Sequence, residues 1–305
     1  VCSSDLSFHW LIKIVSLGNR NNVHHYEKTV SLWPVGMSPN FYEFSISMKK
    51  FVISLSSATE RRSHISSQFE GQGIAFNFFD AVTPDIAARD AQAMKLSVHE
   101  SYIAKGELAC FMSHVHLWQK IVDENIPHMA IFEDDIHLGE KADLFLNHSD
   151  WIENDWHLVK LEAFTPKVIL GSKCKDFPDV GRAIYKLPGK NLGTAGYILS
   201  LQGAKFLLNE IKKIDYIIPL DNFMFEYVVK NHGFEMYQMQ PALCIQDTIL
   251  HYRSSSVQLR SQLTSERKKR MRANKVGGLQ KALVEIARIA AQLKIIFFAC
   301  RVTYK

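Results

Sequence analysis

Five short apolar runs, each about the length of a β-strand, recur along the chain with helical segments between them. The runs cover residues 51–55, 75–79, 128–132, 156–161 and 195–199. Residues 60–70, 107–122 and 202–211 are predicted to be helices, and in 107–122 the apolar side chains recur with helical period. Because strands that alternate with helices form layered folds, the pattern predicts an α/β fold with a mostly parallel central sheet.

The composition indicates a globular protein of one large domain or two small ones. The chain has 305 residues, 47% of them hydrophobic, and can bury a core without cross-links. Its five cysteines are scattered and form no Cys-x-x-Cys pair, which argues against a disulfide framework or a zinc knuckle. With no apolar run of 18 residues and no signal-peptide pattern, we expect a cytoplasmic protein.

The first 47 residues are expected to be a non-native or disordered extension. The chain begins at Val1, and residues 1–47 show no clear period. Met48 stands just before the first apolar run and has the place of a natural start. A genuine N-terminal extension is the alternative. If the segment is a non-native or disordered extension, deletion of residues 1–47 should leave a folded, active protein.

An acidic triplet, Glu133-Asp134-Asp135, directly follows the run 128–132. Ligands of α/β sheets bind outside the carboxyl ends of the strands, so the triplet is expected at a functional edge. In an extended chain Glu133 and Asp135 point the same way and Asp134 points opposite. Carboxylates suit Mg²⁺ or Mn²⁺, which would neutralise a diphosphate leaving group. The alternative is a solvated acidic turn.

The triplet stands among three other motifs in a definite order. The chain reads GELACFMSHVHLW from Gly106, IFEDD from Ile131, GTAGYILSLQGAKFLL from Gly193 and PLDNFM from Pro219. In this order the motifs resemble glycosyltransferase family 25, the lipopolysaccharide and lipooligosaccharide glycosyltransferases, over residues 48–252. Gly196 is a departure, because the family more often reads directly from Ala to Tyr at this point.

The resemblance implies a GT-A-like nucleotide-sugar-binding domain, a UDP-sugar donor, a divalent metal (Mn²⁺ or Mg²⁺) at a DXD-like triplet and an inverting reaction, often with galactose. An inverting transfer needs a base for the acceptor hydroxyl, and Asp221, at the edge of an apolar run, matches the late acid of the family. The alternative for Asp221 is a helix N-cap. The metal ligands are then Glu133, Asp134 and Asp135.

Further residues are expected to contact the donor. A guanidinium at Arg61 would grip the diphosphate, although Arg61 and Arg62 equally fit a solvated helix start. His114 would donate to a phosphate or an acceptor hydroxyl, the alternative being a structural histidine. Glu107 and Ser113 lie six positions apart, so only part of this helix is expected to face the ligand. The expected donor-binding set, in which Thr194 and Ala195 rest on the resemblance alone, is Arg61, Glu107, Ser113, His114, Lys160, Thr194 and Ala195.

The C-terminal segment, residues 253–305, is strongly basic. It holds 13 Lys and Arg against 2 acids, so the preceding residues hold 23 against 29. Between Leu279 and Phe298 the apolar residues recur with a period close to 3.6, which predicts a basic amphipathic helix. Such a helix either lies on the anionic inner face of the bacterial inner membrane or packs on the body. Nucleic acid is not an expected partner, because no aromatic residues interleave with the basic run.

The leading hypothesis is an inverting glycosyltransferase that moves galactose from UDP-galactose to a lipooligosaccharide acceptor. One alternative is a metal-dependent phosphohydrolase built on the acidic triplet, against which the sequence shows no histidine-rich ligand set. Another is a non-catalytic membrane- or carbohydrate-binding module. Collagen-type hydroxylysine galactosyl transfer shares the family pattern, and the missing signal peptide argues against it.

Overall fold

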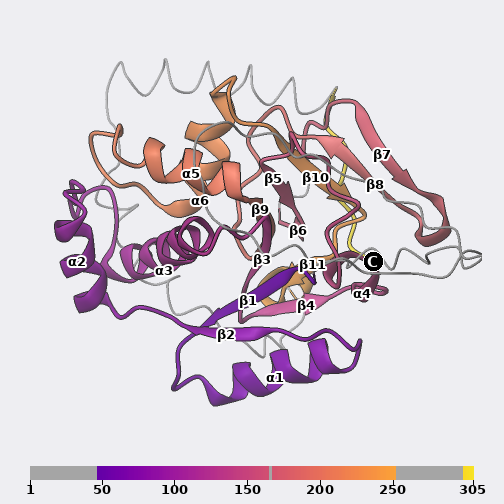
Figure 1. The fold of residues 1–305 in the computed structure, drawn as a ribbon, viewed down its shortest axis with the longest axis horizontal. Helices are drawn as coiled ribbons and strands as arrows, with labels where there is room; N and C mark the ends of the chain where they lie inside the picture. Colours follow the sequence, from indigo (N-terminus) through magenta and orange to yellow (C-terminus); the bar gives the residue numbers. More distant parts are fainter. Residues whose placement is uncertain (1–46, 165–166, 252–297) are drawn as a thin grey trace, which may run out of the picture. The chain divides into compact units, whose positions relative to one another are not determined.

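The computed structural model describes residues 47–164, 167–251 and 298–305, all within one compact unit. Strands and helices alternate through its first part (Figure 1). The predicted strands at 51–55, 75–79 and 128–132 and the helices at 60–70 and 107–122 are confirmed, with shifts of a few residues at their ends. The elements are β1 (Lys49–Ser54), α1 (Thr59–Glu70), β2 (Asn77–Asp80), α2 (Pro84–Ala93), α3 (Lys105–Asp123), β3 (His128–Glu133), β4 (Ile136–Leu138) and α4 (Asp143–Leu146).

The second part is richer in strands. The strands predicted at 156–161 and 195–199 and the helix at 202–211 are present as β5, β9 and α5. The strands are β5 (Leu158–Lys160), β6 (Glu162–Ala163), β7 (Lys173–Phe177), β8 (Arg182–Lys186), β9 (Gly196–Ser200), β10 (Met236–Gln240) and β11 (Cys244–Gln246). The helices are η1 (Pro178–Val180), α5 (Leu201–Glu210), α6 (Leu220–Asn222), the π-helical turn η2 (Phe223–Tyr227), η3 (Val228–Lys230) and α7 (Asp247–Leu250).

The main sheet has eight strands in the order β2-β1-β3-β9-β5-β10-β8-β7. Neighbours are parallel in β2-β1, β1-β3 and β5-β10 and antiparallel elsewhere. The expectation of a mostly parallel sheet is therefore wrong, because β9 runs antiparallel between β3 and β5 and β7 and β8 form an antiparallel hairpin. A second sheet joins β4, β11 and β6.

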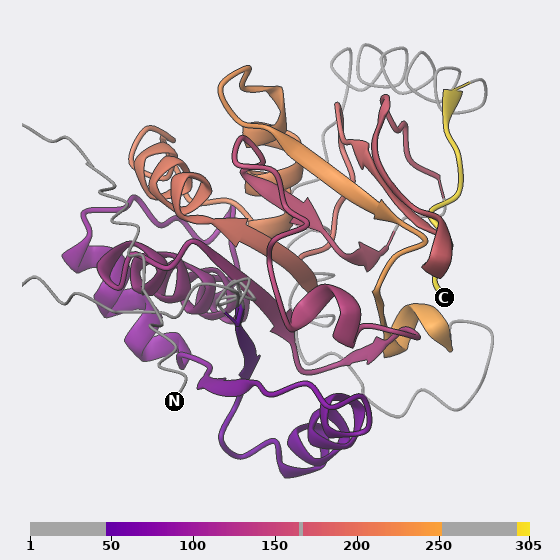
Figure 2. The same cartoon turned by 45° about the vertical axis from the view of Figure 1, so that its right-hand side comes forward.

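Both faces of the main sheet are buried. Consecutive residues of β3, Ile131 and Phe132, belong to two separate hydrophobic clusters, as do Leu158 and Val159 of β5. This follows from the alternation of side chains along a strand and explains why the strands read as continuous apolar runs. One cluster contains side chains of α2, α3 and α5, and the other contains those of α1 and α4 (Figures 1 and 2).

The last residues of the chain pack against this body. Cys300 forms a β-bridge with Val168 and Tyr304 with Ala242, and Val302 is buried. The predicted N-terminal extension and nearly all of the predicted amphipathic helix lie outside the described residues. Within the described residues, no helix is both long and apolar enough to span a bilayer.

Gly196, the departure from the family pattern, begins β9 at a close contact. A Cβ built there would lie 2.3 Å from Cys244 Sγ and 3.2 Å from the ring of Phe132. Both neighbours are fully buried. Since a close-packed core has little room to yield, glycine is required here by packing.

We expect Gly196→Ala to lower the free energy of unfolding by about 1–3 kcal/mol, the usual cost of overpacking a core. Thermal unfolding followed by circular dichroism measures this. Gly189→Ala is the matched control, because its new Cβ would meet no heavy atom within 4 Å. Adding Cys244→Ala to Gly196→Ala should recover part of the loss. An unchanged melting temperature in Gly196→Ala would contradict the packing argument.

Candidate active site

A cavity of about 290 Å³ opens where β1 and β3 end side by side. These parallel neighbours pair Ile53 with Glu133, so their carboxyl ends meet at one edge of the sheet. The loops that follow β1 and β2 and the first turns of α3 complete the walls. The polar side chains that line the cavity belong to Ser54, Arg61, Cys110, Ser113, Glu133, Asp134 and Asp135.

All three acids of the triplet line this cavity. The strand ends at Glu133, and Asp134 and Asp135 form a turn before β4 begins. The alternation of side chains along a strand therefore stops at Glu133. For that reason Asp134 does not point away from the other two acids, as an uninterrupted strand would require.

Asp134 is fixed by two donors from the first strand and helix. Arg61 Nη1 donates to Asp134 Oδ1 at 2.6 Å, and Ser54 Oγ donates to Oδ2 at 2.7 Å. Arg61 thus lies at the cavity wall, in an ion pair rather than in a solvated helix start. The neighbouring Arg62 instead donates to the carbonyls of Ser54 and Leu55.

The other two acids carry opposite shifts in pKa. Burial, followed by the negative charge of Glu133, raises the pKa of Asp135 to about 7. Burial alone would raise the pKa of Glu133 as well, but nearby His114, the Thr194 hydroxyl and Arg61 together lower it. The carboxyl groups of the triplet thus lie near a single guanidinium, that of Arg61. Oxygen donors with surplus negative charge fit a divalent cation such as Mg²⁺ or Mn²⁺, which Glu133 and Asp135 would hold.

Thr194 and His114 contact Glu133. Thr194 Oγ1 donates to Glu133 Oε1 at 2.9 Å, and His114 Nε2 lies 3.8 Å from the same oxygen. His114 is fully buried, and its Nδ1 is bonded to the hydroxyl of Tyr197 at 2.8 Å. Its Nε2 has no hydrogen-bond partner within the described residues. The Thr194 hydroxyl therefore orients Glu133, and His114 lies beside the same oxygen without a hydrogen bond to it.

Lys160 lies beneath the loop that carries Thr194. Its Nζ donates to the carbonyls of Asn191, Leu192 and Gly193 at 2.5–2.8 Å, and the side chain is fully buried. Lys160 therefore holds the loop and does not line the cavity. Burial lowers its pKa to about 8.

Glu162, which the sequence analysis did not single out, completes this arrangement. It is fully buried 3.7 Å from Lys160 Nζ and accepts a hydrogen bond from the backbone N–H of Ala195 at 3.0 Å. Burial raises its pKa to about 7. The signal in the sequence is the spacing, because residues two apart in an extended chain share a face.

The two other residues predicted on α3 have different places. Ser113 lines the cavity, accepts from the N–H of Val82 at 3.0 Å and donates to the carbonyl of Ala109. Glu107 caps the start of α3, where it accepts from the N–H of Ala104 at 2.9 Å, and it does not line the cavity. Only part of this helix faces the cavity, as the six-residue spacing predicted.

Asp221 lies in the short helix α6 and is buried. Pro219 occupies the N-cap position, so Asp221 stands in the first turn, where its Oδ1 accepts from the N–H of Asn222 at 2.9 Å. After burial and the charge of Glu133, the charge of Asp221 helps to raise the pKa of the Cys110 thiol. Phe223, two residues after Asp221, packs on Phe111 of α3 with ring centroids 5.7 Å apart, so the segment that carries Asp221 lies against the helix whose Cys110 lines the cavity.

Among the residues that the structure describes, two groups of side chains have the spacing of metal ligands. One is Cys110, His114 and Glu133, whose ligand atoms lie within 4.8 Å of one another. Burial raises the pKa of Cys110 well above its ordinary value, so a metal would have to displace the thiol proton to bind here.

The second group, His137, Asp247 and His251, was missed by the sequence analysis. Both histidines are bonded to Asp247 Oδ1 at 2.9 Å. The backbone N–H of Asp247 donates to the carbonyl of Asp135 at 2.8 Å, so this group is hydrogen-bonded to the backbone of the triplet. The four-residue spacing of Asp247 and His251 was visible in the sequence, but their approach to His137, 110 residues earlier, was not.

Comparison with known proteins gives consistent matches. Residues 47–224 match the profile of glycosyltransferase family 25 (LPS biosynthesis protein). The chain is 40% identical over 216 residues to the lacto-N-neotetraose biosynthesis glycosyltransferase LgtE of Neisseria gonorrhoeae, covering 67% of this chain and 75% of the relative. It is 36% identical over 249 residues to the lipooligosaccharide biosynthesis protein lic2B of Haemophilus influenzae, covering 78% and 90%.

The raised pKa of Asp135 has a consequence for stability. A carboxyl with a raised pKa in the folded chain stabilises it below the unfolded pKa, near 3.8, and this contribution is lost as pH rises towards 7. In metal-free protein with a chelator present, Asp135→Asn should therefore match the wild-type melting temperature near pH 4. At pH 8 it should melt a few degrees higher.

Thermal scans from pH 4 to 8 measure this difference. Asp179→Asn is the control, because that side chain is exposed and should show no pH-dependent change. An Asp135→Asn variant that melts below the wild type at pH 8 would contradict the charge balance described for the triplet.

Proposed function

The chain belongs to glycosyltransferase family 25, and on this premise we propose that it transfers galactose from UDP-galactose to a lipooligosaccharide acceptor with inversion. Its relatives make it a glycosyltransferase of lipopolysaccharide or lipooligosaccharide biosynthesis. The phosphohydrolase and the non-catalytic module are thereby set aside. The observation that carries the proposal is the acid-lined cavity at the carboxyl ends of β1 and β3.

The donor is proposed to bind in this cavity, in a GT-A-like domain. A nucleoside diphosphate needs positive charge, and Arg61 at the wall and a cation held by Glu133 and Asp135 would supply it. The cation would take up the negative charge that develops on the diphosphate. In this arrangement Asp134 keeps Arg61 in place, and the Thr194 hydroxyl keeps Glu133 in place.

Asp221 is proposed as the base. The acceptor hydroxyl oxygen forms a bond to the anomeric carbon from the side opposite the diphosphate, and the proton of the hydroxyl passes to the Asp221 carboxylate. The bond from the anomeric carbon to the diphosphate oxygen breaks, and its electron pair leaves with UDP. The packing of Phe223 on Phe111 supports this role, because it brings the segment that carries Asp221 against the helix that lines the donor cavity.

Release of UDP from a panel of UDP-sugars tests the proposal. We expect release from UDP-galactose that requires Mn²⁺ or Mg²⁺ and that rises when truncated lipooligosaccharide is added. Asp135→Ala should abolish this release and leave the fold intact. Release of UDP from a different UDP-sugar would show that the proposed donor is wrong. No release from any UDP-sugar, with a folded protein, would overturn the proposal.

The Asp221→Asn variant tests whether Asp221 acts as the base rather than as a donor-binding group. Because the amide cannot accept the proton, we expect kcat to fall by about 10²–10⁴-fold while the KM for the donor changes by less than about threefold. Asp179→Asn serves again as the exposed control. A near-normal kcat in a folded Asp221→Asn variant would remove Asp221 from the reaction.

A further inference from the structure

Three tyrosines near α6 leave much of their aromatic surface exposed. Tyr102, Tyr216 and Tyr227 are 45%, 44% and 41% exposed. Leaving this much aromatic surface in water forgoes the free energy that burying it would release, so several such rings in one region suggest a surface that binds something.

Two of the tyrosines form a preassembled pair. The rings of Tyr102 and Tyr216 stack with centroids 4.9 Å apart and an angle of 10° between their planes. His99 lies edge-on to both rings, with its centroid 5.8 Å from Tyr102 and 6.0 Å from Tyr216. The N–H of Ile217 donates to the carbonyl of Ser97 at 2.9 Å and joins the two segments. The pair is therefore fixed before any ligand arrives.

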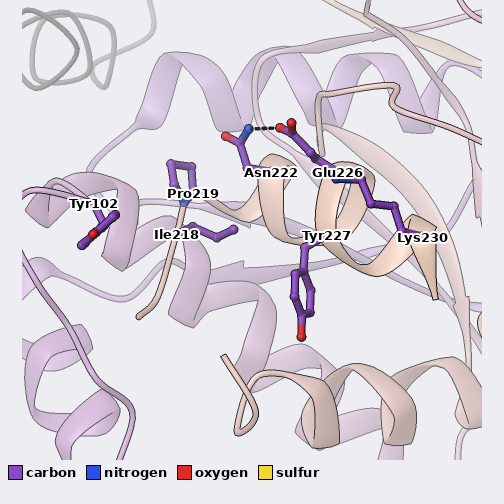
Figure 3. Close-up of a pocket in the computed structure, with 7 residues that line it drawn as sticks. All are labelled: Tyr102, Ile218, Pro219, Asn222, Glu226, Tyr227 and Lys230. Carbon is purple, nitrogen blue, oxygen red and sulfur yellow. Dashed lines mark hydrogen bonds between the residues drawn. The ribbon is translucent and has the colours of Figure 1, made fainter. Parts of the chain in front are cut away.

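Tyr102 and Tyr227 line a groove of about 410 Å³ (Figure 3). This lies within the range of small-molecule sites, roughly 300–1,000 Å³. Ile218 and Pro219 add an apolar surface between the two aromatic residues. The remaining lining is polar, from Asn222, Glu226 and Lys230.

The polar lining has a fixed orientation. Asn222 Nδ2 donates to Glu226 Oε2 at 2.8 Å, and Lys190 Nζ approaches the same oxygen at 2.7 Å. An amide, a carboxylate and the ammonium of Lys230 together offer both donors and acceptors. Sugar hydroxyls need both kinds of partner, and the C–H face of a pyranose ring packs well on an aromatic ring. The lining thus matches a carbohydrate in its apolar and its polar parts.

The groove adjoins the proposed base. Asn222, which lines the groove, directly follows Asp221 and donates its backbone N–H to the Asp221 carboxylate at 2.9 Å. A sugar in the groove would therefore lie beside the base.

We propose that the groove between Tyr102 and Tyr227 binds the acceptor oligosaccharide, with pyranose rings stacked on the tyrosines and hydroxyls bonded to Asn222, Glu226 and Lys230. The identity of the ligand as the acceptor rests on the proposed glycosyltransferase function. The donor cavity is a separate site that shares no lining residue with the groove.

The test compares Tyr102→Ala and Tyr227→Ala with the wild type, with lipid-free oligosaccharide prepared from lipooligosaccharide as the acceptor. We expect the KM for this acceptor to rise about tenfold or more, while the KM for the donor and the acceptor-independent release of UDP stay within about twofold. Tyr102→Phe should keep most of the affinity, because it keeps the ring. Tyr185→Ala on β8 is the control, and melting temperatures establish that each variant folds.

Binding of the same oligosaccharide without turnover, measured by saturation-transfer NMR with UDP present, separates the two proposals. Bound oligosaccharide in the wild type that is lost in Tyr102→Ala supports the groove even if no donor is turned over, and in that case only the proposed function fails. Transfer with an unchanged acceptor KM in both alanine variants overturns the groove and leaves the function standing. If the two alanine variants lose binding to anionic vesicles but bind the oligosaccharide as the wild type does, the acceptor groove is also overturned, in favour of a membrane contact.

Discussion

The antiparallel placement of β9 between β3 and β5 is the constraint on which the candidate active site depends. Because β9 runs against β3, Gly196 pairs with Phe132, and the residues before β9 arrive at the carboxyl end of β3. The N–H of Glu133 donates to the carbonyl of Ala195 at this junction, and Thr194 reaches the Glu133 carboxylate. In an all-parallel sheet the start of this strand would lie at the opposite edge, and the acids would lack these partners.

Most of the buried charge around the triplet is balanced by a neighbouring charge of opposite sign, but that of Glu133 and Asp135 is not. Lys160 and Glu162 offset each other beneath the loop, and Lys160 satisfies three carbonyls that would otherwise be costly to bury. Arg61 offsets Asp134. Glu133 and Asp135 remain without an ion-pair partner of this kind, and burial, together with the charge of Glu133, raises the pKa of Asp135. A stable fold rarely keeps such a surplus without use, which is why the triplet is a better candidate for a cation site than for a solvated turn.

The elements that the sequence predicted well are those with a local period. The strand ending in Glu133 and the helix bearing Ser113 are in this class, because apolar spacing alone defines them. Strand direction has no such signature, so the mixed sheet was not foreseen. Long-range contacts were also invisible: Lys160 looks like a surface residue at a strand end until the loop at Asn191 folds over it, and His137 meets Asp247 only through the pairing of β4 with β11.

The short helix α6 links the two sites, and its construction explains how one segment serves both. Pro219 cannot donate a hydrogen bond and stands at the N-cap position, so Asp221 falls in the first turn, where it is buried. The next residue, Asn222, then faces the groove and bonds Glu226. A transferase must bring an acceptor hydroxyl, a base and an anomeric carbon into contact, and two adjacent residues, about 100° apart around one helical turn, can place the base next to the acceptor.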